Sequence, residues 1–211
     1  MTETIVHLLR HGEVDNPNNI LYGRLPGFHL SELGNEMAQL VYDNFLAGRD
    51  VSYLASSPLE RTLETAAPAA KGFALEVHKD DRLIEGHNEF EGQKVNKKTF
   101  TNRKNLRYLH NPFKPSWGES YKDIVTRMQV AIETAAKKAE GHEALLVSHQ
   151  LPIWMARQSA ENKRLIHNPK NRQCTLASVT SFAFKDGKIV KVEYCEPAKK
   201  LLANAKTLPG A

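Results

Sequence analysis

The chain has 211 residues, a net charge of +5 and two cysteines. This length allows one sizeable hydrophobic core, and no internal repeat or Ser/Gly/Pro-rich linker interrupts it, so we expect a single domain over residues 1–211. Cys174 and Cys195 are too few for a disulfide scaffold and lack metal-ligand spacing, which predicts free thiols and no metal. Without a signal peptide or an apolar run that could span a bilayer, we expect a cytoplasmic protein without membrane contact.

The positive charge is concentrated in one segment. Residues 93–117 contain seven Lys and Arg residues and no Asp or Glu, so the net charge of +5 becomes −2 for the remainder of the chain. We interpret this segment as a basic insertion that folds over a pocket as a lid; the alternative is a solvated surface excursion. A local patch favours an anionic small molecule as partner and argues against nucleic acid, and the sequence leaves the oligomeric state open.

The first predicted strand, residues 5–9, ends at Arg10 and His11. Side chains at the carboxyl end of a strand in an open α/β sheet gather where ligands usually bind. A neutral imidazole can attack phosphorus, and a neighbouring guanidinium can bind phosphoryl oxygens with forked hydrogen bonds. Gly12 would let a ligand approach the backbone. Alone, this tripeptide is equally compatible with an ordinary ion-pairing cluster at a strand end.

The next stretch predicts two helices around a strand at residues 51–55. Turn-forming residues 13–27 form a loop beside the site, and Ser31 caps a helix that ends near Gly48. After the strand, we expect Ser57 to cap a second helix with Pro58 at its first position and Glu60 completing a capping box. Arg61 then lies in the first turn, where it reaches an anion; the alternative is a surface ion pair with a nearby glutamate.

An acid-rich loop at residues 80–92 follows a predicted edge strand at residues 75–77. Phosphoester cleavage requires a carboxyl group that gives a proton to the leaving oxygen, and burial raises the pKa of such a group toward neutrality. Glu85, Glu89 and Glu91 are the candidates for this proton donor. His87 has no metal-ligand partner nearby and is interpreted as a polar loop residue.

The second half predicts scaffold elements and a second histidine at a strand end. Ser120 and Asp123 begin the longest helix, which Gly141 terminates. A buried strand at residues 144–148 then leads to His149, much as the first strand leads to His11. A helix at residues 151–159 and a hairpin of residues 176–184 and 189–194 complete the sheet. No chemistry is read in the Lys- and Ala-rich tail.

Six motifs occur in one order, and together they are specific. They are Leu8-Leu9-Arg10-His11-Gly12-Glu13, Leu30-Ser31-Glu32-Leu33-Gly34, residues 56–66, Leu83-Ile84-Glu85, Gly118-Glu119-Ser120 and Val147-Ser148-His149. Over roughly three quarters of the chain this series resembles the histidine phosphatase superfamily, the phosphoglycerate-mutase-like enzymes. The strand-helix alternation predicts, and the resemblance strengthens, a three-layer α/β/α sandwich whose mainly parallel sheet has an antiparallel hairpin strand.

The resemblance implies roles for particular residues. His11 would be the nucleophile, Glu85 the proton donor, and Arg10, Arg61 and His149 the groups that hold the phosphoryl oxygens. Further phosphate or substrate contacts are expected from Asn16, Asn18, Gly23 and Gln150. The usual asparagine position falls on Pro17, and Gln150 stands where many members have glycine, so the pocket wall is bulkier there.

The predicted function is a metal-independent phosphatase that hydrolyses a small phosphate monoester through a phosphohistidine, without a cofactor. A phosphoglycerate mutase, which returns the phosphoryl group to a substrate hydroxyl, uses the same residues and is the alternative. A non-enzymatic module that binds phosphorylated ligands is a remote alternative. A P-loop nucleotide enzyme is excluded, because the chain lacks the Gly-x-x-x-x-Gly-Lys-Ser/Thr motif.

Overall fold

A central sheet organises the computed structural model, which describes residues 3–94 and 118–205. In these ranges the sheet has six strands in the order β3-β2-β4-β1-β5-β6. They are β1 (Thr4–Arg10), β2 (Val51–Ser56), β3 (His78–Lys79), β4 (Glu143–Ser148), β5 (Val179–Lys185) and β6 (Lys188–Cys195). The pairs β3·β2, β2·β4 and β4·β1 are parallel, whereas β1·β5 and β5·β6 are antiparallel. The predicted mainly parallel sheet with an antiparallel hairpin is confirmed.

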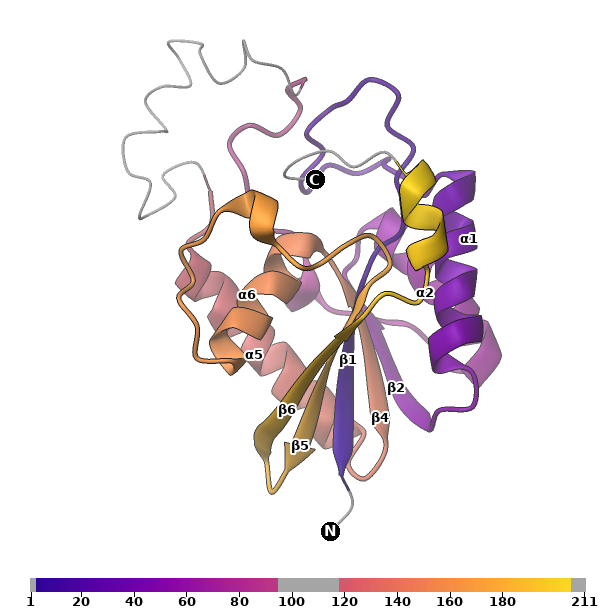
Figure 1. The fold of residues 1–211 in the computed structure, drawn as a ribbon, viewed down its shortest axis with the longest axis vertical. Coiled ribbons are helices and arrows are strands. Elements are labelled where there is room, and N and C mark those ends of the chain that lie inside the picture. The colour runs from indigo at the N-terminus through magenta and orange to yellow at the C-terminus, as the bar shows by residue number, and fades with distance from the viewer. Residues whose placement is uncertain (1–2, 95–117, 206–211) are drawn as a thin grey trace.

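Helices cover both faces of this sheet, which gives three layers (Figure 1). One face carries α1 (Glu32–Val41), its π-helical continuation η1 (Tyr42–Leu46) and α2 (Glu60–Phe73); the other carries α5 (Tyr121–Lys138) and α6 (Gln150–Ala160). Short 3-10 turns lie at η2 (Asp81–Leu83), η3 (Pro169–Asn171) and η4 (Lys199–Asn204). None of the helices in the described ranges is both long and apolar enough to cross a membrane.

The alternation of side chains along β1 separates two cores. Val6 and Leu8 pack with α5 and α6, while Leu9 packs with α1 and α2. Successive side chains of a strand point to opposite faces, so a strand covered on both sides reads as a continuous apolar run. Parallel pairing with β4 sets the direction of β1, so Arg10 and His11 lie at its carboxyl end.

Two of the three predicted serine caps are confirmed, and the third is wrong. The Oγ atoms of Ser31 and Ser120 accept hydrogen bonds from the third backbone amide that follows each, at 3.0 and 3.2 Å. By contrast, α2 begins at Glu60 with Leu59 at its cap and no capping side chain. The Ser57 hydroxyl is instead 2.9 Å from Nε2 of His149. The hydroxyl that the sequence pattern predicted as a helix cap therefore forms a tertiary contact.

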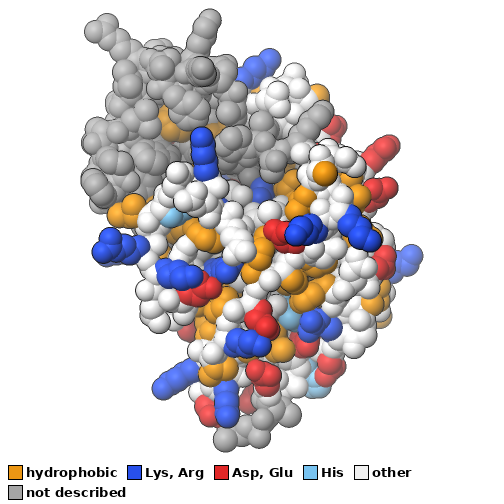
Figure 2. Space-filling model, viewed as in Figure 1, with side chains coloured by type: hydrophobic (Ala, Val, Ile, Leu, Met, Phe, Trp, Pro, Cys, Tyr) orange, Lys and Arg blue, Asp and Glu red, His pale blue; other side chains and the backbone are white. Residues whose placement is uncertain are grey.

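The predicted edge strand at residues 75–77 is also misplaced, because pairing with β2 starts only at His78. Helix α2 extends to Phe73, and Ala74 in the left-handed region turns the chain back toward the sheet. The predicted basic lid at 93–117 lies outside the described residues from Val95 onward. On the face shown in Figure 2, basic and acidic side chains are interspersed over the described surface.

Candidate active site

Two neighbouring parallel strands bring the two strand-end histidines together. Arg10 of β1 is in register with Ser148 of β4, so the residues that follow them, His11 and His149, leave the sheet side by side. Their ring centroids are 5.2 Å apart and both residues are fully buried. The backbone amide of His11 donates to the carbonyl of Ser148 at 3.1 Å, which extends the strand pairing into the site.

The hydrogen bonds of His11 define which ring nitrogen faces the pocket. Nδ1 lies 2.8 Å from the carbonyl oxygen of Gly12, which can only accept, so Nδ1 carries the proton. Nε2 is buried and has no hydrogen-bond partner among the described residues. Burial, followed by the charges of Arg61 and Arg10, holds the pKa of His11 well below its ordinary value. The ring is therefore neutral at pH 7 with a lone pair on Nε2, the form that can act as a nucleophile.

Arg61 and Arg10 place two buried guanidinium groups beside this ring. Nη2 of Arg61 donates to the carbonyl of Gly23 at 2.6 Å, and Nη1 of Arg10 donates to the carbonyl of Cys174 at 2.7 Å. The predicted alternative, an ion pair of Arg61 with Glu60 or Glu64, is not what the structure shows: those carboxylates bind the amides of Gly27 and Leu30. Burial leaves these charges little contact with water, so an anion would be bound strongly.

Two further nitrogens of Arg61 mark a place for a ligand. Nε and Nη1 are buried and lack a hydrogen-bond partner among the described residues. The ring of Tyr22 packs 4.7 Å from the guanidinium carbon, and its centroid is 6.4 Å from that of His11. Buried N–H groups of a charged side chain are rarely left unsatisfied, because each costs about 1–3 kcal/mol or more. These donors therefore point to an anionic group next to Nε2 of His11.

His149 is positioned by Ser57 and Arg61. Its Nε2 lies 2.9 Å from the Ser57 hydroxyl, and its Nδ1 lies 3.5 Å from Nη2 of Arg61. Because a guanidinium only donates, Nδ1 carries the lone pair and Nε2 the proton. Burial, and then the charge of Arg61, keeps the pKa of His149 well below its ordinary value. The negative charge of an anion bound beside His149 would raise this pKa again and so favour the protonated ring, which can donate from both nitrogens.

Glu85 is the buried carboxyl group of this site. It follows η2, where the Ser148 hydroxyl donates to the carbonyl of Leu83 at 2.6 Å and so ties the loop to β4. Arg24 donates to the backbone carbonyl of Glu85 at 2.7 Å, and the amide of Gly86 donates to its Oε1 at 2.8 Å. Burial is the largest influence and raises the pKa of Glu85, which the Gly86 amide, Arg61 and Arg172 oppose. A raised pKa keeps a proton available for a leaving group.

The rival carboxylates have other surroundings. Glu89 is exposed and lies 3.3 Å from His87, itself an exposed loop residue as predicted. Glu91 accepts a hydrogen bond from the backbone amide of Asn88 at 3.2 Å. Its negative charge favours the charged form of Arg61. Of the three candidate proton donors, only Glu85 is buried.

The asparagines predicted to contact phosphate lie elsewhere. The carboxamide of Asn16 donates to the carbonyl of Ile20 at 2.8 Å and accepts from its amide at 3.0 Å, so it closes its own turn. Asn18 is exposed in that turn. The structure thus brings neither side chain into the group around His11, because the turn uses Asn16 for its own backbone.

Three other predicted residues act through their neighbours. Gly12 is not open to a ligand: a Cβ there would lie 2.5 Å from the carbonyl oxygen of Gly34, so the residue permits close packing of the α1 start. Gly23 has a φ of +40° and a Cβ would collide with Glu91, while its carbonyl binds Arg61. The Gln150 carboxamide donates to the carbonyl of Cys174 at 3.2 Å, the same acceptor that Arg10 uses.

Sequence reasoning missed three side chains of the site. Tyr22 was predicted only as part of a loop, Ser57 was assigned to a helix cap, and Arg172 was not singled out. Arg172 is partly buried and influences Glu85 electrostatically. The available sequence signals were a cation, Arg172, and an aromatic residue, Tyr22, in otherwise polar loops. Because loops lack periodicity, the sequence does not predict which way these side chains point.

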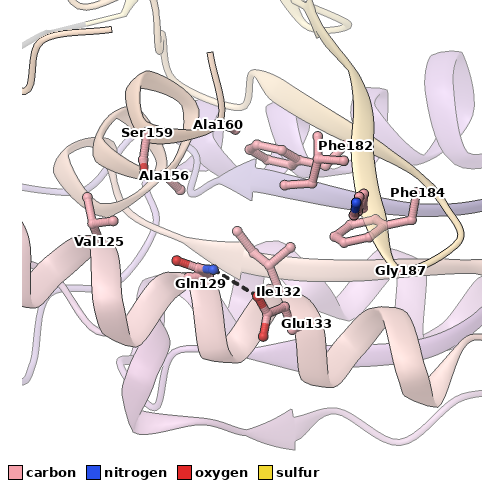
Figure 3. A pocket seen from close by; sticks show the side chains of 12 residues that line it. Val125, Gln129, Ile132, Glu133, Ala156, Ser159, Ala160, Phe182, Phe184 and Gly187 are labelled. Carbon is pink, nitrogen blue, oxygen red and sulfur yellow. Dashed lines mark hydrogen bonds between the residues drawn. The ribbon is translucent and has the colours of Figure 1, made fainter. Parts of the chain in front are cut away.

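A cavity elsewhere in the molecule contains none of these groups. It has a volume of about 310 Å³ and lies between α5, α6 and the β5–β6 hairpin (Figure 3). Its walls include Ile132, Phe182 and Phe184, and its lining contains no histidine or arginine. Within the described part of the chain, no group of three or more His, Cys, Asp or Glu side chains could hold a metal ion.

Comparisons with known proteins show the family and the fold of the chain. Residues 6–197 match the model of the histidine phosphatase superfamily (branch 1). The chain is 49% identical over 198 residues to uncharacterized protein Rv0525 of Mycobacterium tuberculosis, covering 93% of this chain and 98% of that protein. It is 32% identical over 151 residues to phosphoserine phosphatase 1 of Hydrogenobacter thermophilus, covering 69% and 71%. The solved structure of YhfR from Bacillus stearothermophilus superposes with a TM-score of 0.75 at 23% identity, covering 88% of this chain and 94% of that one.

Proposed function

Since the chain belongs to the histidine phosphatase superfamily, we propose that it hydrolyses a small phosphate monoester through a phosphohistidine at His11. One observation carries this proposal: the buried Nε2 of His11 and the buried Nε and Nη1 of Arg61 all lack partners among the described residues. A lone pair beside unsatisfied cationic donors suits a phosphoryl group, whose phosphorus accepts the lone pair while its oxygens accept the hydrogen bonds.

In the first step, Nε2 of His11 attacks phosphorus and the bond from phosphorus to the ester oxygen breaks. Glu85 gives its proton to that oxygen, so the alcohol leaves neutral and Glu85 becomes a carboxylate. The ring of His11 gains positive charge, which the Gly12 carbonyl stabilises through the 2.8 Å contact at Nδ1. The phosphoryl group is then bonded to Nε2.

The charge that develops on the phosphoryl oxygens is balanced by Arg10, Arg61 and His149. Both guanidinium groups are held by backbone carbonyls, so they are in place before the substrate binds. Preorganised donors in a site shielded from water contribute more than the same donors in solution. The positive charge that stabilises the transition state thus comes from side chains, and the proposal assigns no role to a metal.

In the second step, the Glu85 carboxylate accepts a proton from water while the water oxygen attacks phosphorus. The bond from phosphorus to Nε2 breaks, which restores neutral His11, protonated Glu85 and free inorganic phosphate. If a substrate hydroxyl takes the place of water, the same steps give a mutase. Phosphoserine phosphatase 1, as a relative at 32% identity, supports hydrolysis of a small phosphorylated substrate.

A panel of phosphate esters that includes both monophosphoglycerates tests this function. We expect inorganic phosphate to be released at the same rate with and without a chelator. Interconversion of the two monophosphoglycerates without release of phosphate would assign the mutase activity instead. Binding of the esters without either reaction would indicate the non-enzymatic module.

A further inference from the structure

Arg172 lies in the loop between α6 and β5, where two side chains hold its guanidinium group. Its Nε donates to Nε2 of His167 at 2.8 Å, and its Nη1 lies 3.4 Å from Oε1 of Gln150. These contacts use two of the five N–H donors of a guanidinium, so three remain on Nη1 and Nη2. Nη2 has no hydrogen-bond partner among the described residues.

Both acceptors are neutral. Nδ1 of His167 lies 2.7 Å from the carbonyl oxygen of Leu165, so the proton is on Nδ1 and the lone pair on Nε2 faces Arg172. The imidazole ring lies 5.7 Å from the ring of Tyr121 and 5.8 Å from that of Trp154. This aromatic surrounding orients His167 without adding charge. The guanidinium is therefore positioned while its positive charge is left intact.

Glu85 is the acidic side chain whose charge acts on Arg172, and in the proposed function it is protonated when the substrate binds. Among the described residues, no Asp or Glu forms an ion pair with Arg172. Residues 1–2, 95–117 and 206–211, which the structure does not describe, contain no Asp or Glu. An arginine that is partly buried and whose hydrogen-bond partners are neutral is unusual, because burial of a charge is costly unless an opposite charge pairs with it.

The position of Arg172 relative to the other charges indicates which part of a substrate it faces. The principal charges acting on His11 are Arg61 and Arg10. Those acting on Glu85 are Arg61, Arg172 and Arg10, in that order. Gln150 links the two regions, because its carboxamide contacts Arg172 and also donates to the Cys174 carbonyl that Arg10 binds. Arg172 thus lies toward Glu85, the side from which the alcohol would leave.

We propose that Arg172 binds a carboxylate on the alcohol portion of the substrate. This inference rests on the proposed function, in which Glu85 protonates that alcohol. The planar end of a guanidinium presents parallel N–H groups that match the two oxygens of a carboxylate. With Nε bound to His167 and one N–H of Nη1 bound to Gln150, Arg172 keeps one N–H on Nη1 and two on Nη2 for a carboxylate. The preferred substrates are phosphate monoesters of small hydroxy acids.

The test compares two esters that differ at one group, 3-phosphoglycerate and glycerol 3-phosphate, in which a hydroxymethyl group replaces the carboxylate. We expect wild-type protein to prefer 3-phosphoglycerate, and Arg172→Met to lower the ratio of the two kcat/KM values about ten- to a hundredfold. Arg172→Lys should lower the ratio less, because it keeps the charge and loses the planar fork. The control is Arg164→Met, at an exposed arginine of the same loop, which should leave the ratio at the wild-type value.

An equal loss on both esters in Arg172→Met, or no preference in the wild type, would overturn the inference. A second measurement is independent of turnover: 3-phosphoglycerate should raise the melting temperature of wild-type protein more than glycerol 3-phosphate, and Arg172→Met should abolish that difference. If wild-type protein hydrolyses neither ester but shows this difference, the proposed function fails while the carboxylate site stands. Equal shifts in the wild type would overturn the site itself.

Discussion

Two buried histidines, His7 within strand β1 and His11 directly after it, have surroundings that differ in one decisive respect. Nδ1 of His7 lies 2.7 Å from the Ser181 hydroxyl, and its Nε2 lies 2.9 Å from the carboxylate of Glu143. Among the described residues, the His11 ring has one hydrogen-bond partner, the Gly12 carbonyl, and the charges that act on the ring are those of Arg61 and Arg10. His7 is thus satisfied on both sides by the protein, whereas His11 is left with an open lone pair in a cationic pocket.

This difference separates a histidine that stabilises the fold from one that is arranged for a ligand. The carboxylate of Glu143 compensates His7 and is itself bound by Arg49, and the hydrogen bond from His7 is the main cause of a lowered Glu143 pKa. Around His11, no such compensation is provided by the Gly12 contact, and the nearby charges are positive. Burial alone therefore does not identify a catalytic histidine; an unused nitrogen together with uncompensated charge does.

The largest expected effect is on turnover in His11→Ala. Loss of the nucleophile should lower kcat at least about a thousandfold, because the phosphohistidine cannot form. The matched control is His7→Phe, which removes two partly buried hydrogen bonds and should lower the free energy of unfolding by about 1–3 kcal/mol without changing kcat/KM. Steady-state kinetics and urea denaturation measure the two quantities. Comparable activity of the two variants would remove the distinction between these histidines.

A smaller effect is expected for Glu85→Gln, and it should depend on the leaving group. Hydrolysis of an alkyl phosphate should slow about a hundredfold or more, whereas nitrophenyl phosphate, whose phenolate leaves without a proton, should be affected much less. Because burial raises the pKa of Glu85, wild-type kcat/KM for the alkyl ester should decline only at a pH above the ordinary range of a glutamate. The variant should lack that decline. Equal losses on both substrates would reassign the acid.

The two site histidines should also make stability depend on pH. Their lowered pKa values keep them neutral in the folded protein, whereas the unfolded chain binds protons below about pH 6.5. The free energy of unfolding should therefore fall with decreasing pH, by up to about 1.4 kcal/mol per pH unit for each histidine. Urea denaturation between pH 5 and pH 7.5 measures this slope.

The double variant His11→Asn/His149→Asn is the control for this slope and should flatten it. Glu85 acts in the opposite direction, because its pKa is raised in the folded protein, but it is present in both proteins and cancels in the comparison. The same slope in wild type and double variant would contradict a neutral, proton-excluding histidine pair.

The smallest effect is expected for Ser57→Ala. Its hydroxyl orients His149 through the 2.9 Å contact, and loss of one such hydrogen bond is worth about 1 kcal/mol, or roughly fivefold in kcat/KM. Ser56→Ala is the matched control, because among the described residues the Ser56 hydroxyl forms a hydrogen bond only with the carbonyl of Ser57. A loss in Ser56→Ala as large as in Ser57→Ala would show that orientation of His149 is not the cause.

Much of the fold and part of the site followed from the sequence, because apolar runs and helix caps are local sequence patterns. The apolar run before Arg10 and the run before His149 predicted two parallel strands, and parallel strands end at one edge of a sheet. The caps at Ser31 and Ser120 are likewise set within one helical turn. These features depend on neighbours in the chain.

What the sequence did not predict depends on contacts between distant segments. Ser57 matched a capping box, yet its hydroxyl binds the buried ring nitrogen of His149, which is 92 residues away in the chain. Asn16 matched a phosphate contact only approximately, and its amide closes its own turn. Arg172 is in a loop without periodicity, and its place beside Glu85 follows only from how the loop packs on α6.

The central claim, that Nε2 of His11 is the phosphoryl acceptor, can be tested by trapping the intermediate. Wild-type protein mixed rapidly with a substrate and quenched in alkali, where phosphohistidine survives, would be digested and analysed by mass spectrometry. The account predicts one phosphoryl group on the peptide that contains His11, and none in His11→Ala. A phosphoryl group on His149 or Ser57, or turnover with no phosphorylated protein at any time, would contradict it.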